Sequence, residues 1–312
     1  MVSVPRAMHS KDFYDEKYIF RQPPLVVFMA MDSPRGTREH SKAKEMVKDE
    51  GSKLVHREVD VDMKLLDKFF RKLNPDTVIK RLVNHTRAEI FEEIDNINAN
   101  SYDAFYFVVL SYLDKGHHHH HHEHEASDTG FKIQFYDKSI EMSELMDRVK
   151  SRPGMALKPK VFIVQADDLE LLTPNIIHKA IPSGPGYKES IVKIPTDADQ
   201  LLLVSTIPQS LVEKGHATSV AHSDGGIVTH PTEQDERARR ENSGHTIPKS
   251  SLLIQAFAQV LRDSDLDVFS NTPTINGKVL ELLKSLQLGN EFDDKIPVPN
   301  VYSTLTRFLC LK

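Results

Sequence analysis

"KPKVFIVQADDL", residues 158–169, is the stretch of this 312-residue sequence that decides the fold. Its apolar part at 159–165 does not alternate with polar residues, which is typical of a strand in a parallel sheet covered on both faces. The strand runs into two carboxylates, Asp167 and Asp168. They could in principle act as general acid and base, but adjacent strand residues point to opposite faces. As unrelated surface aspartates at the end of a strand they would need no special explanation.

The sequence on either side of this stretch alternates between strand and helix patterns. Buried or half-buried strands are predicted at 25–31, 53–61, 102–112, 199–206 and 301–311, and helices at 37–51, 63–73, 77–97, 139–151, 251–263 and 275–289. Strands that alternate with helices predict an α/β fold with a mostly parallel sheet and helices on both faces.

Composition narrows the class of protein. With 39% hydrophobic and 27% charged residues, the chain has the make-up of a soluble globular protein. Its net charge of -5 provides no field that would attract nucleic acid or an anionic membrane. Apolar runs such as 24–31 are far shorter than the roughly 20 residues of a spanning helix, and the N-terminus lacks an apolar signal core, so we expect a cytoplasmic protein. The single cysteine, Cys310, allows neither an intramolecular disulfide nor a cysteine-rich zinc site.

Two polar stretches, 116–130 and 216–246, interrupt the pattern and are expected to be mobile loops. The histidine run 117–122 could bind a divalent metal, but a homopolymeric run fixes no ligand geometry. "SDTG" at 127–130 matches the Asp-Thr-Gly of aspartic proteases, yet it occurs once and in the wrong fold class, which leaves Asp128 a weak candidate acid. We therefore expect no specific metal site and no cofactor.

Several segments, in order from about residue 18 to 312, resemble the caspase family. "YDAFYFVVLSYLDKG" is similar to the segment ending in the catalytic "LSHG", and "KPKVFIVQADDL" to "KPKLFIIQACRG". "KIPTDADQLLLVSTIPQS", "SSLLIQAFAQVL" and "IPVPNVYSTLTRFLCLK" resemble small-subunit segments. The resemblance implies a three-layer fold around a six-stranded, mostly parallel sheet. It further implies a short extension at 1–17, a large-subunit half at 18–168, a linker at 169–192, and a small-subunit half at 193–312 with an insertion at about 216–247.

The resemblance also implies a cysteine protease whose thiolate attacks a carbonyl while a histidine manages the protons. In this sequence the histidine of "LSHG" falls on Tyr112, the following glycine, at the oxyanion position, on Leu113, and the cysteine of "QACRG" on Asp167. Cys310 lies in the last strand, in no motif like the nucleophile turn, and reads as a small apolar residue. We therefore expect an inactive homologue.

The specificity pocket implied by the family also looks eroded. Caspases hold the substrate aspartate between two arginines and the motif glutamine, a bidentate arrangement. The glutamine is kept as Gln165, one arginine falls on Lys214, and the other is assigned to Arg35, one position away from the expected place. A lysine is a point charge that does not replace a planar guanidinium.

Activation by cleavage is not expected, because no aspartate occurs from 169 to 196. The last strand, which in the family pairs across a two-fold axis, keeps an alternating pattern, with Val301, Ser303, Leu305 and Arg307 as interface candidates. The sequence thus predicts a pseudocaspase that forms a heterodimer with an active caspase paralogue, or a homodimer, and regulates apoptosis or related signalling. The alternatives are a decoy that binds a caspase inhibitor or substrate through the eroded groove, and a hydrolase that uses Asp167 or Asp128.

Overall fold

The computed structural model describes residues 16–32, 57–114, 131–172, 199–212, 250–288 and 299–312. Within these ranges, none of the helices has the length and apolar character needed to cross a membrane. The predicted helix at 37–51, Arg35, the histidine run, Asp128, Lys214, the whole loop at 216–246 and most of the linker lie outside the described residues.

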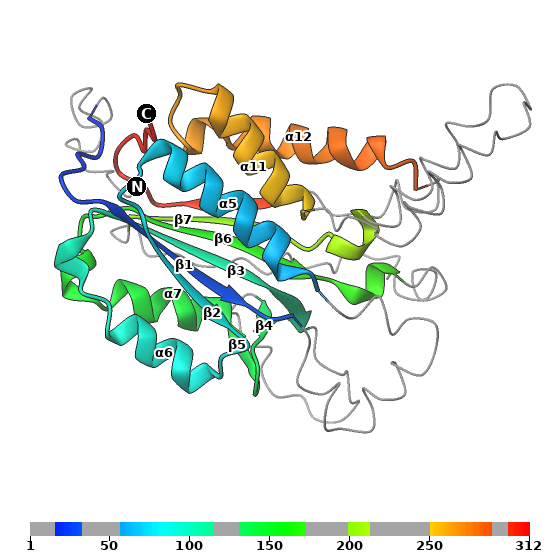
Figure 1. Ribbon diagram of the computed structural model, residues 1–312, viewed down its shortest axis with the longest axis horizontal. Helices are drawn as coiled ribbons and strands as arrows, with labels where there is room; N and C mark the ends of the chain where they lie inside the picture. Colours follow the sequence, from blue (N-terminus) through cyan, green and yellow to red (C-terminus); the bar gives the residue numbers. More distant parts are fainter. Residues whose placement is uncertain (1–15, 33–56, 115–130, 173–198, 213–249, 289–298) are drawn as a thin grey trace, which may run out of the picture.

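A twisted sheet runs through the molecule in the order β2-β1-β3-β6-β7-β8, and β4 and β5 extend from β3 as a small antiparallel pair (Figure 1). The five strands from β2 to β7 are parallel, and β8 joins β7 antiparallel at the edge. The predicted fold class is therefore confirmed. The strands are β1 (Pro24–Ala30), β2 (Val78–Val83), β3 (Ala104–Asp114), β4 (Lys132–Gln134), β5 (Ser139–Glu141), β6 (Lys160–Asp167), β7 (Gln200–Ser205) and β8 (Asn300–Ser303).

Helices cover both faces of the sheet (Figure 1). One face packs against α5 (Val59–Leu73), α11 (Leu252–Asp263) and α12 (Thr272–Ser285), and the other against α6 (Arg87–Asp95) and α7 (Met142–Lys150). Along β6, Val161 and Ile163 belong to the first core and Phe162 and Val164 to the second. This is why the strand reads as a continuous apolar run: both of its faces are buried. Short 3-10 turns lie at Ala99–Ser101, Pro153–Met155, Leu169–Leu172 and Phe269–Asn271.

Three predicted elements were wrong in part. Residues 59–61, read as the end of a strand at 53–61, form the first turn of α5. The helix predicted at 77–97 is instead the edge strand β2 followed by α6. Because β2 pairs on one side only, with β1, its Lys80 and Arg81 stay partly exposed and the apolar signal of a central strand is missing. The strand predicted at 301–311 ends at Ser303.

The carboxyl ends of the central parallel strands meet at one edge of the sheet. In the register of β3 with β6, Tyr112 lies opposite Asp167, the last residue of β6. At the other end of the sheet, the chain after β8 meets the N-terminal segment: Phe308 N–H donates to the carbonyl of Glu16, and Tyr18 N–H to the carbonyl of Phe308. The segment that begins at Glu16 and the C-terminal residues thus lie together, away from the carboxyl ends of the strands.

Candidate functional site

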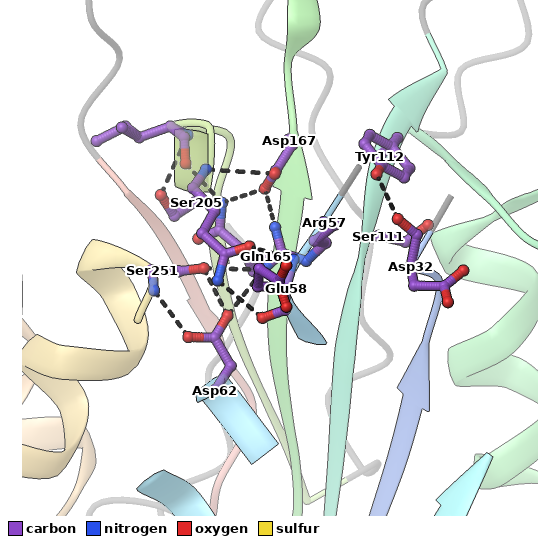
Figure 2. Close-up of polar contacts among 12 residues, drawn as sticks. Asp32, Arg57, Glu58, Asp62, Ser111, Tyr112, Gln165, Asp167, Ser205 and Ser251 are labelled. Atoms are coloured by element: carbon purple, nitrogen blue, oxygen red, sulfur yellow. Dashed lines mark hydrogen bonds and ion pairs between the residues drawn. The ribbon is translucent and has the colours of Figure 1, made fainter. Parts of the chain in front are cut away.

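A buried polar cluster lies where β6 ends (Figure 2). The carboxylate of Asp167, whose residue is 3% exposed, receives donors on both oxygens. Its Oδ1 accepts from Arg57 Nη1 at 2.5 Å and from Gln165 Nε2 at 2.8 Å, and its Oδ2 accepts from the backbone N–H of Gln209 at 3.3 Å. Asp167 is therefore held by three donors from three separate parts of the chain.

Arg57 bridges Asp167 to a second carboxylate. Its Nη2 lies 2.8 Å from Asp62 Oδ2 and 2.8 Å from Ser251 Oγ. Asp62 also accepts from the backbone N–H of Ser251 at 2.7 Å and from its hydroxyl at 2.6 Å. The cluster thus joins Arg57, two residues before α5, to the first turn of α5, the end of β6 and the residue before α11, and so links segments from distant parts of the chain.

One guanidinium serves two carboxylates in this cluster, so the buried charges do not balance when all three groups are ionised. Burial raises the pKa of Asp62 and of Asp167, although the charge of Arg57 works against this shift. Burial also acts to lower the pKa of Arg57, but the two carboxylates outweigh it and raise that pKa. The guanidinium is therefore the fixed charge around which the two carboxylates are arranged.

Two polar atoms of the cluster have no hydrogen-bond partner among the described residues: Arg57 Nε and Gln165 Oε1. The orientation of the Gln165 amide is set by two acceptors, Asp167 Oδ1 and the carbonyl of Ile207, both of which take hydrogen bonds from Nε2. Its oxygen is therefore left over. An unsatisfied donor and an unsatisfied acceptor in one buried cluster call for an explanation, since such groups are rare in the interior.

Gln209 is itself anchored through its side chain. Its Oε1 accepts from the backbone N–H of Glu58, and its Nε2 donates to the carbonyl of Glu58, at 3.0 and 2.9 Å. This pair of bonds fixes the chain just after β7 to the chain just before α5. It thereby holds the Gln209 N–H and the Arg57 side chain on the same carboxylate.

Tyr112, beside Asp167 in the strand register, points elsewhere. Its hydroxyl donates to the backbone carbonyl of Asp32 at 3.1 Å, and Figure 2 shows the ring directed toward Asp32 and away from the cluster. Burial, reinforced by the Asp167 charge, raises the pKa of Tyr112 far above its ordinary value. Leu113, the next residue, pairs with Ile133 of β4.

The two adjacent aspartates serve different structural roles. Asp168 Oδ1 accepts from the backbone N–H of Glu170 at 3.1 Å, whereas Asp167 faces Arg57. They do not form a dyad, as the strand geometry predicted. The idea that they are ordinary surface aspartates was wrong, however, because Asp168 is only 6% exposed and Asp167 still less.

Cys310 lies far from this cluster. Because β8 is antiparallel to β7, the chain beyond Ser303 continues toward the amino ends of the parallel strands. There Leu309 N–H donates to Asp267, and Leu309 accepts from Val268 N–H. Cys310, which follows Leu309, is thus at the opposite end of the sheet from Asp167. Among the described residues, no group of three or more histidine, cysteine or acidic side chains could hold a metal ion.

Of the three residues predicted for the substrate pocket, the structure places Gln165 beside Asp167, and Arg35 and Lys214 lie outside the described residues. The arginine that meets Asp167 is Arg57, which sequence reasoning missed because it assigned 53–61 to a strand. A signal was present in α5. Asp62 occupies the buried helix face together with Val59, Met63, Leu66, Phe69 and Phe70. A carboxylate on an apolar face requires a buried partner.

A family model for the caspase domain matches residues 52–310. The chain belongs to the caspase family. Among solved structures, one described as pro-sf-caspase-1 superposes with a TM-score of 0.59 at 17% identity, covering 96% of this chain and 99% of that one. The Drosophila initiator caspase Dronc gives a TM-score of 0.50 at 15% identity, covering 96% of this chain and 86% of Dronc. At these identities the structures establish the shared caspase fold alone. Curated protein sequences contain no significant match.

Proposed function

We propose that the chain is a non-catalytic member of the caspase family that regulates an active caspase, in apoptosis or related signalling, by forming a heterodimer through β8. The observation that carries the loss of catalysis is the state of Asp167. A carboxylate is a far weaker nucleophile toward an amide than a thiolate, and this one already accepts hydrogen bonds on both oxygens.

The other groups of the site support the same proposal. The Tyr112 hydroxyl is engaged with the carbonyl of Asp32, and its raised pKa makes it a poor base near neutral pH. Cys310, the single thiol of the sequence, lies at the other end of the sheet and would not reach a substrate bound beside Asp167. Leu113 stands at the proposed degenerate oxyanion position. We therefore propose that neither peptide hydrolysis nor covalent labelling occurs at this site.

The edge of the sheet supports an assembly role. Among the described residues, β8 pairs with β7 alone, which leaves its other side as a sheet edge. Thr304 N–H donates to the carbonyl of Gln200, and the alternation of an antiparallel ladder then directs the N–H groups of Val301 and Ser303 to the outer side. A free strand edge is a template for pairing with another chain. We propose Val301 and Ser303 as the centre of the interface.

The two remaining interface candidates lie beyond β8. Leu305 packs against the core beneath α11 and α12, and Arg307 Nη1 lies 3.2 Å from Glu16 Oε2 of the N-terminal segment. In the proposed dimer they flank the paired strands. The partner would be an active caspase paralogue, with a second copy of this chain as the alternative, in the cytoplasm.

The interface is tested with Ser303→Pro against Ser303→Ala. Both variants remove the hydroxyl that accepts from Leu305 N–H, but only proline removes the outward-facing backbone N–H. Tagged protein is recovered from native lysate, and an aspartyl ketone probe detects any active caspase bound to it. We expect an active caspase with the wild type and with Ser303→Ala, and loss with Ser303→Pro. Recovery of only an inhibitor or substrate would support a decoy instead.

Catalysis is tested on the purified protein with aspartyl peptide substrates and the same ketone probe. We expect neither turnover nor labelling. Labelling of the wild type above the level of a Cys310→Ala variant would overturn the proposed inactivity.

A further inference from the structure

The Asp167 carboxylate is surrounded by more hydrogen-bond donors than a single ion pair would provide. A guanidinium, a side-chain amide and a backbone N–H converge on the two oxygens of one carboxylate. Each donor is held in place by further hydrogen bonds. These bonds join Arg57 to Asp62 and Ser251, Gln165 to the carbonyl of Ile207, and Gln209 to Glu58. A pre-organised set of charged and neutral donors is how proteins recognise a carboxylate with specificity.

We propose that Arg57, Gln165 and the backbone of Gln209 form a carboxylate-binding site, and that Asp167 occupies this site as a ligand carried within the chain. The wild-type protein is therefore closed to carboxylate ligands at this position. The site opens only when the Asp167 carboxylate is removed or displaced.

The leftover atoms of the cluster support a binding site rather than a core contact. Arg57 Nε is an unused donor and Gln165 Oε1 an unused acceptor among the described residues, and both belong to side chains that Asp167 already contacts. Arg57 is 2% exposed and Gln165 0% exposed. A core contact selected for stability alone would be expected to satisfy these groups. Of the two atoms, Arg57 Nε is donor capacity that Asp167 does not use, whereas Gln165 Oε1 is an acceptor and cannot bond to a carboxylate.

This inference is separate from the proposed heterodimer, which uses the outer edge of β8, two strands away from β6 in the sheet. It bears on the decoy alternative instead. An acidic segment of another protein could reach the Arg57 guanidinium only by displacing the Asp167 carboxylate. Because Asp167 belongs to the same chain as Arg57, it competes for the guanidinium at a very high effective concentration.

Chemical rescue tests the site directly. Asp167→Ala removes a group the size of formate, and Asp167→Gly removes one the size of acetate. We expect sodium formate to raise the melting temperature of Asp167→Ala by about 2 °C or more over sodium chloride at equal ionic strength, with propionate ineffective. For Asp167→Gly, acetate should match or exceed formate. Relaxation of ¹³C-labelled formate, measured with and without each variant, reports binding without reference to stability.

The matched control is Asp168→Ala, which removes the neighbouring carboxylate and leaves Arg57 paired. Formate should have no more effect than chloride on this control or on the wild type. Equal stabilisation of all three proteins would show a general salt effect and overturn the proposal. A carboxylate-insensitive Asp167→Ala would also overturn it. If Asp167→Ala is unfolded, the smaller change Asp167→Ser is used. The proposed carboxylate-binding site is contradicted if formate fails to restore folding to Asp167→Ala and to Asp167→Ser.

Discussion

Two buried carboxylates at opposite ends of the sheet are held in different ways. At the carboxyl end, Asp167 is paired with Arg57, which also serves Asp62. At the amino end, Asp199, just before β7, accepts from the hydroxyls of Tyr18 and Thr306, each at 2.6 Å. Asp167 contacts a charged donor, whereas Asp199 accepts from neutral hydroxyls and also interacts electrostatically with Lys160.

The difference predicts unequal costs of removing one partner. A buried charge that loses its counterion keeps its full desolvation cost, whereas a carboxylate that loses one of two neutral donors keeps the other. The charged end is where the candidate active site lies. The neutral end fastens the N-terminal segment to the residues that follow β8, because Tyr18 and Thr306 come from those two segments.

The largest effect is expected from Arg57→Ala. It leaves Asp62 and Asp167 buried without a counterion, so the free energy of unfolding should fall by about 3–5 kcal/mol at neutral pH. Chemical denaturation measures this change. The control is Arg71→Ala on the same helix, which breaks an exposed pair with Asp67 and should cost about 0–1 kcal/mol.

The pH dependence of the Arg57→Ala deficit separates lost charge from lost volume. Without the guanidinium, burial raises the pKa of both carboxyls further above their unfolded values, so the folded variant binds more protons than the unfolded chain. Its stability then falls as pH rises, and the deficit should be smaller at pH 5 than at pH 8. A deficit that is constant with pH would indicate a packing defect and weaken the contrast between the two ends.

The sequence predicted the centre of this fold better than its margins. The apolar runs 25–31, 102–112 and 159–165 correspond to β1, β3 and β6. These strands were recognisable because both of their faces are buried, so almost every residue in them is apolar. The edge strand β2 has no such pattern. Its boundary with α6 was still readable, since the Thr-x-x-Glu sequence that starts at Thr86 is typical of a helix start, and Thr86 accepts from Glu89 N–H there.

The candidate site was predictable in position but not in its contacts. The resemblance assigned Tyr112 and Asp167 to the two catalytic positions, and the register of β3 with β6 places them opposite each other. The partner of Asp167 was not foreseen, because Arg57 is 110 residues distant in sequence and a local pattern carries no information on such a contact. The same limit applies to Tyr18 and Asp199, which are 181 residues apart.

A smaller effect is expected from Tyr18→Phe at the neutral end. The change removes the hydroxyl that donates to Asp199 and accepts from Thr306 N–H at 3.1 Å, but Asp199 keeps the Thr306 hydroxyl. We expect a loss of about 1–3 kcal/mol in the free energy of unfolding. Tyr106→Phe is the control, since its hydroxyl makes no hydrogen bond to another described residue, and it should cost less. A Tyr18→Phe loss as large as that of Arg57→Ala would remove the distinction between the ends.

The smallest effect concerns Lys160, the first residue of β6, whose ammonium donates to the carbonyls of Met155 and Lys158. Burial lowers the pKa of Lys160 from 10.5 to about 8. Between these values the unfolded chain binds more protons than the folded protein, so this residue makes stability rise with pH. The rise should be measurable between about pH 8 and 9, below the range in which unfolded tyrosines begin to lose their protons.

Two substitutions isolate this contribution. Lys160→Met is neutral in both states, and Lys160→Arg stays charged in both, so neither releases a proton on folding in this range. Between about pH 8 and 9, the free energy of unfolding of the wild type should therefore rise relative to that of both variants, as measured by urea denaturation at fixed ionic strength. If the wild type gains on neither, folding does not lower the pKa of Lys160. The amino end of the sheet would then keep a buried ammonium above pH 8 as well as below it, and Asp199, like Asp167, would have a charged neighbour over the whole range.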